Sequence, residues 1–80
     1  MDQRALGHLA EEAAELAERA DLAQLERGAR IGHLIHAAAR RHGYAPWAMT
    51  SLVAAEWDRL GIRRVPRFTD LHAVVGVRDG

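Results

Sequence analysis

Several residue types are absent or scarce in this 80-residue chain, and each absence excludes a class of protein. No cysteine is present, which excludes disulfide bonds, thiol redox chemistry and zinc sites built on thiolates. No apolar run approaches the ~20 residues that a membrane-spanning helix needs. The N-terminal segment has no basic stretch followed by an apolar one, so we expect no signal peptide. We therefore expect a cytoplasmic protein with no membrane contact and no cofactor.

Large side chains are also scarce, although 49% of the residues are apolar. Much of that fraction is alanine, which permits close packing and adds little buried area. The only aromatic residues are Tyr44, Trp47, Trp57 and Phe68. A chain of this length forms a single domain, residues 1–80, and buries only about 60% of its unfolded surface. Because so thin a core is often completed by a second copy, we expect a homo-oligomer, most simply a homodimer.

Lysine is absent, so all eleven positively charged side chains are arginines. Eleven acidic residues balance them, but the two signs are unevenly distributed. Residues 1–26 hold seven acidic residues and two arginines, a net charge of −5, and residues 27–80 hold nine arginines and four acidic residues, a net charge of +5. An asymmetry of this kind can select a binding partner.

Proline is confined to Pro46 and Pro66, and the first half of the chain follows a helical period. A first helix is predicted from about residue 3 to residue 19, because apolar residues recur three and four apart. We expect a break near Ala20 and Asp21, since Asp21 followed by Gln24 matches a capping box. A second helix is then predicted from about residue 22 to residue 42, and one continuous helix through residue 42 is the alternative. The second helix has a main apolar face and a weaker one, the latter formed by Leu22, Leu25 and Ala29.

The segment RHGYAPW contains the clearest helix boundary. Gly43 is suited to the left-handed position that ends a helix. Pro46 is suited to the first turn of the next one, where its missing N–H costs nothing. We therefore predict a third helix over residues 46–60, ended by Gly61.

The C-terminal residues 70–77 form either a short helix, capped by Thr69, or an edge strand. The short helix is favoured. The predicted fold class is all-α, a small bundle of three main helices plus a short C-terminal helix or strand.

Glu56 is a charged residue inside the apolar stripe of the predicted third helix. At about 100° per residue it falls among Leu52, Val53 and Leu60. An unpaired buried carboxylate has a raised pKa and can serve as a general acid or base. Pairing with an arginine, such as Arg59 three residues later, is the favoured explanation. A subunit interface ranks second, and a functional carboxylate ranks third.

His42 also continues an apolar stripe, beside the Gly43 turn. If the second and third helices form an antiparallel hairpin, His42 is about three helical turns from Glu56, so direct contact is not expected. A capping role at the helix end is therefore favoured for His42. If the bundle binds a small molecule between its helices, the predicted site residues are Glu56, Trp57, Met49 and His42.

Two further groups were candidates for binding sites. His33 and His36 are three residues apart, which suits two metal ligands, but no third ligand is fixed and no metal site is predicted. The arginines Arg59, Arg63, Arg64 and Arg67 form a cluster of the kind that binds phosphates. Because Pro66 falls where a recognition helix should begin, the region does not match a helix-turn-helix. Pairing of these arginines with acidic residues of the first helix, in the same or another chain, is favoured.

No phosphate loop, nucleophile elbow or strong zinc motif is present, so no motif identifies an enzyme. The chain shares only its size and composition with small bacterial helical regulators. We predict a small, non-catalytic protein-interaction or regulatory protein that acts as a homo-oligomer. Trp47, which faces away from the stripe of the third helix, is the best candidate for a partner contact. The alternatives are nucleic-acid binding through the arginine cluster and a small-molecule-binding bundle with Glu56 in the pocket.

Overall fold

The computed structural model describes residues 1–62, which form three α-helices. Helix α1 spans Gln3–Ala17, α2 spans Gln24–His42 and α3 spans Pro46–Leu60. Each helix packs against both of the others, and residues 1–62 contain no strand. The prediction of an all-α fold with three main helices is therefore confirmed. The helix or strand predicted at residues 70–77 lies outside the described residues.

The ends of α2 and α3 follow from single residues. Helix α2 ends at Gly43, which has a φ of 76°, and α3 ends at Gly61, which has a φ of 75°. Side chains with a Cβ atom rarely adopt this left-handed conformation, so glycine terminates both helices. Pro46 occupies the first turn of α3, where no intrahelical partner for its nitrogen is lost.

The predicted break between the first two helices is confirmed, but the predicted capping box is not. Helix α2 begins at Gln24, and its N-cap residue Ala23 makes no side-chain capping bond. The carboxylate of Asp21 instead accepts hydrogen bonds from Arg19, at 2.7 and 2.5 Å. A second contact holds the connection between α1 and α2: the guanidinium of Arg27 donates to the Arg19 carbonyl oxygen at 2.6 Å. The capping box predicted that Asp21 accepts from the backbone N–H groups at the start of the second helix. Its carboxylate accepts from the Arg19 guanidinium instead.

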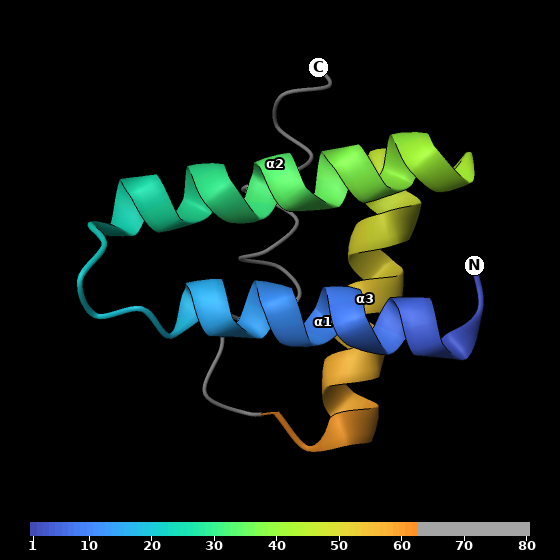
Figure 1. The fold of residues 1–80 in the computed structure, drawn as a ribbon, viewed down its shortest axis with the longest axis horizontal. Helices are drawn as coiled ribbons and strands as arrows, with labels where there is room; N and C mark the ends of the chain where they lie inside the picture. Colours follow the sequence, from blue (N-terminus) through green and yellow to red (C-terminus); the bar gives the residue numbers. More distant parts are fainter. Residues whose placement is uncertain (63–80) are drawn as a thin grey trace.

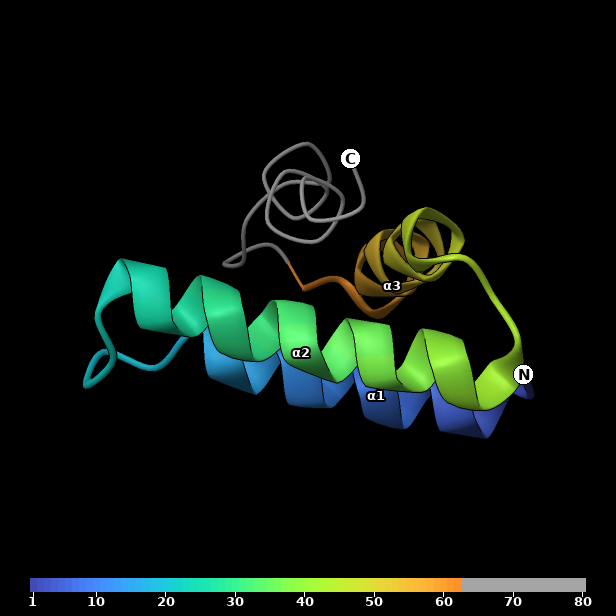
Figure 2. The same ribbon diagram turned by 90° about the horizontal axis from the view of Figure 1, so that it is seen from above.

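Helices α1 and α2 form an antiparallel hairpin, and α3 crosses one side of it (Figure 1). Seen along the layer, α3 lies on one side of the α1–α2 pair, and no described element lies on the other side (Figure 2). The antiparallel hairpin considered for the second and third helices is therefore not formed. The first two helices make that hairpin instead.

The core lies where the three helices meet, and it is as thin as the composition predicts. Among the described residues ten apolar side chains are buried, and four of these are the alanines Ala10, Ala13, Ala14 and Ala39. The largest buried group is Trp57, whose indole Nε1 donates to the Ala10 carbonyl oxygen at 2.8 Å. This bond ties α3 to the middle of α1. Small residues at the contacts let the helices approach closely and leave little apolar volume inside.

Candidate functional site

Glu56 lies at the crossing of α1 and α3, and only 3% of its surface is exposed. Both of its carboxylate oxygens are bonded. Arg59 donates through Nε to Oε1 at 3.0 Å and through Nη2 to Oε2 at 2.6 Å, and Gln3 donates through Nε2 to Oε1 at 2.8 Å. Arginine pairing, the favoured explanation of this buried charge, is therefore confirmed as a contact.

The local sequence explains half of this arrangement and the helix crossing explains the rest. Residues three apart share a helix face, so Arg59 reaches back to Glu56 within α3. Gln3 comes from the first turn of α1, 53 residues away in the chain. Gly7, one helical turn after Gln3, also lies beside the carboxylate, since a Cβ added there would be 3.7 Å from Glu56 Oε2. The carboxylate therefore joins the start of α1 to the end of α3.

The contacts lower the pKa of the Glu56 carboxyl below its ordinary value. The hydrogen bond from Arg59 is the largest cause, and the Arg59 charge and the Gln3 hydrogen bond act in the same direction. Burial acts in the opposite direction and is outweighed. The raised pKa expected of an unpaired carboxylate is thus wrong for Glu56. A carboxylate that is ionised at neutral pH and bonded on both oxygens has no proton to donate.

The other residues of the predicted small-molecule site do not gather around Glu56. Met49 is fully buried and Trp57 is 3% exposed, and both belong to the packed core. His42 is exposed at the end of α2. The structure therefore brings Trp57 and Met49 into one cluster, but it does not join His42 and Glu56 to them around a cavity.

The predicted partner residues divide into three cases. Trp47 is 62% exposed, although it is a large apolar side chain. Arg59 is about half exposed, and its guanidinium is bonded to Glu56. The acidic partner of Arg59 therefore lies in α3. The predicted pairing of this arginine with an acidic residue of the first helix is not observed. The three remaining arginines, Arg63, Arg64 and Arg67, lie outside the described residues.

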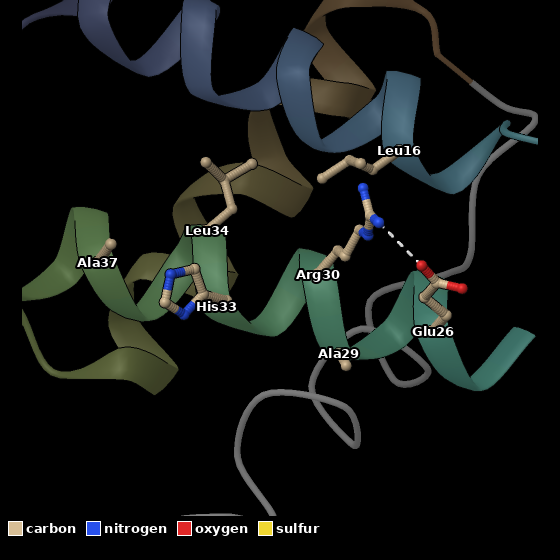
Figure 3. A pocket seen from close by; sticks show the side chains of 7 residues that line it. All are labelled: Leu16, Glu26, Ala29, Arg30, His33, Leu34 and Ala37. Atoms are coloured by element: carbon tan, nitrogen blue, oxygen red, sulfur yellow. Dashed lines mark hydrogen bonds and ion pairs between the residues drawn. The ribbon is translucent and has the colours of Figure 1, made fainter. Parts of the chain in front are cut away.

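A groove that sequence reasoning missed lies between α1 and α2, on the side opposite α3 (Figure 3). Its volume is about 460 Å³. Leu16 of α1 and Leu34 of α2 face it, and Glu26 and Arg30, one helical turn apart on α2, pair at its rim at 2.8 Å. Among the described residues the lining is Leu16, Glu26, Ala29, Arg30, His33, Leu34 and Ala37. The only hint in the sequence was the weaker apolar face of α2, of which Ala29 is the one member that lines the groove.

The charges that line this groove are balanced within α2. Glu26 supplies the one carboxylate of the lining and Arg30 the one guanidinium, and the two pair with each other. Glu12 and Glu15 of α1 are exposed, as are Arg40 and Arg41 in the last turn of α2.

Two other kinds of site find no support among residues 1–62. No three His, Asp or Glu side chains of this region converge in a way that could hold a metal ion. None of the helices described here combines the length and apolar character that crossing a bilayer requires.

Comparison of the chain with protein-family models, curated proteins and solved structures finds no match.

Proposed function

We propose that this chain is a small, non-catalytic protein-interaction or regulatory protein that acts as a homo-oligomer. The observation that carries the proposal is the groove between α1 and α2, which no described element covers. Apolar surface that is left open in this way is typical of interaction sites. The exposed side chains of Leu25, at 87%, and Trp47, at 62%, support the same reading.

The polar chemistry of the described residues also favours binding over catalysis. Glu56 is the one charged group buried among them, and its carboxylate is bonded to the chain's own Arg59 and Gln3. A catalytic carboxylate needs a free lone pair or a proton that faces substrate. Glu56 faces the backbone of α1 at Gly7 instead. The best-supported role for Glu56 is to fix the crossing of α1 and α3.

The two alternative functions have less support. Nucleic-acid binding relied on four arginines, and the guanidinium of Arg59 is already held by Glu56. Small-molecule binding relied on Met49 and Trp57, which are packed in the core. The observed groove uses neither set.

Sedimentation equilibrium of the full chain tests the proposal. We expect a molar mass that rises with protein concentration toward that of a dimer or a larger assembly. A monomer mass at every concentration up to the millimolar range would overturn self-association. Trp47→Ala, examined in the same way, shows whether this exposed side chain contributes to the assembly.

A further inference from the structure

We propose that one end of the helical bundle binds single-stranded nucleic acid, through phosphate contacts to exposed arginines and stacking of a base on Trp47. This basic end consists of residues 1–4, 40–42 and 46–47, which are the start of α1, the end of α2 and the start of α3. The inference goes beyond the proposed function, because it uses a different part of the molecule and does not require self-association.

Three helix ends converge at the basic end. The antiparallel hairpin places the start of α1 beside the end of α2, and α3 begins at the same end of the hairpin after residues 43–45 (Figure 1; Figure 2). A hydrogen bond joins these segments, since the Met1 nitrogen donates to the Tyr44 hydroxyl oxygen at 3.1 Å. Residues that are about 40 positions apart in the sequence therefore form one surface here.

The arginines of the basic end have no acidic partner of their own. Arg4, Arg40 and Arg41 are exposed, and they take part in none of the ion pairs among residues 1–62. Of the carboxylates nearby, that of Glu56 is held by an ion pair, and that of Asp2 accepts from a backbone N–H of α1. Three unpaired guanidinium groups leave the surface positively charged, which is the electrostatic character of a phosphate-binding site.

An exposed tryptophan beside these arginines selects the kind of anion. Trp47 is 62% exposed in the first turn of α3, six residues after Arg41. Exposed aromatic rings next to positive charge are the usual stacking platforms for the bases of single strands. Because the bases of a duplex are already stacked on one another, Trp47 favours a single strand over a double one.

Other polyanionic partners fit the basic end less well. An anionic membrane surface requires an extended apolar face beside the charge. The other exposed large apolar side chains, Leu25 and Leu60, lie at the opposite ends of their helices and give the basic end no such face. An acidic protein segment accounts for the arginines alone, whereas a nucleotide supplies both a phosphate and a flat ring.

Fluorescence anisotropy with the full chain tests the inference. The probes are labelled oligothymidine and oligouridine of about twelve nucleotides, a length within the usual site size of single-strand binders. Three phosphate contacts predict that affinity falls about 20-fold when salt rises from roughly 50 to roughly 200 mM. Absence of binding at the lower salt concentration with millimolar protein, or an affinity that does not depend on salt, would overturn the inference.

Replacement of Trp47 separates stacking from general apolar contact. Trp47→Leu keeps an apolar side chain but removes the ring, and we expect it to weaken binding about fivefold or more. Trp47→Phe keeps a ring and should stay within about threefold of the unmodified chain. Equal losses in the two variants, or no loss in Trp47→Leu, would overturn the stacking contact.

Two arginine variants with the same net charge test the place of the phosphate contacts. Arg41→Gln should weaken binding and reduce its dependence on salt by about one phosphate contact. The matched control is Arg30→Gln, a change about 16 Å away along α2, which is beyond the screening length of about 8 Å at physiological salt. We expect the control to change affinity by less than about twofold, and equal effects of the two substitutions would overturn the assigned position. Circular dichroism checks that each variant keeps its helices.

The competing partners and the proposed function are distinguished in the same experiments. Tighter binding of phosphatidylserine vesicles or of polyglutamate than of the oligonucleotides would overturn the inference, and so would equal binding of a duplex. Sedimentation and oligonucleotide binding are measured separately. A monomer that binds the single strand therefore overturns only the proposed self-association, and an oligomer that does not bind it overturns only this inference.

Discussion

Replacement of Trp57 by phenylalanine tests the part of the structure on which the three-helix packing depends. The indole is 3% exposed, and its Nε1 donates to the Ala10 carbonyl oxygen at 2.8 Å. Trp57→Phe keeps an aromatic ring in the core but removes this donor and part of the ring. The variant should therefore unfold more easily than the unmodified chain.

The magnitude follows from two contributions. A buried hydrogen bond contributes about 0.5–1.5 kcal/mol net, and the value here should lie at the lower end because the Ala10 carbonyl also lies within α1 and keeps its helical partner. The lost ring atoms and the space they leave add roughly 1–2 kcal/mol. We expect the free energy of unfolding to fall by about 1.5–2.5 kcal/mol, out of about 4–12 kcal/mol for a domain of this length.

Thermal unfolding followed by circular dichroism at a fixed protein concentration measures this loss. For a domain of this size the midpoint should fall by roughly 6–20 °C. Trp47→Phe is the matched control, because Trp47 is 62% exposed and the same substitution there should change stability by less than about 0.5 kcal/mol. Equal effects of the two substitutions would show that Trp57 is not the buried anchor of the bundle.

Three smaller predictions follow from single residues. Since Arg59 lowers the pKa of Glu56, the stability that this carboxylate contributes is present above its ordinary pKa of 4.5 and is lost as the pH falls further. Glu56→Gln should therefore flatten the dependence of the unfolding midpoint on pH below 4.5. Parallel curves for the variant and the unmodified chain would contradict this. Gly7→Ala should stabilise the chain by about 0.5–1 kcal/mol in urea unfolding, because an added Cβ would lie 3.7 Å from the nearest Glu56 oxygen, an ordinary contact. The same substitution at Gly43 should destabilise it by about 1–2 kcal/mol, because the φ of 76° disfavours a Cβ. A loss of stability at Gly7 would refute the first explanation, and unchanged or higher stability at Gly43 would refute the second.

The boundaries of the third helix could be predicted because they depend on local chemistry. Pro46 and Gly61 act through their own backbone geometry, and the structure places α3 between them as the sequence indicated. The start of α2 could not be placed in the same way. Asp21 had two possible partners, the backbone of the next helix and the guanidinium of Arg19, and the sequence does not show which one is nearer.

The partners of Glu56 show the same limit. Arg59 could be predicted, because a spacing of three residues is fixed by the helix itself. Gln3 could not, because it reaches Glu56 only through the crossing of α1 and α3. The groove could not be predicted either, since it depends on which side of the α1–α2 pair α3 covers. Contacts within one helix follow from spacing, and contacts between helices require the packing.

Self-association through the α1–α2 face is the central claim, and backbone amide NMR over a dilution series tests it most directly. As the protein is diluted, we expect amide shifts to move together along one binding curve, with the largest changes at Leu16, His33 and Ala37. Amides on the outer side of α3, near Trp47, should change least. Spectra that do not depend on concentration, or changes centred on α3, would contradict the claim.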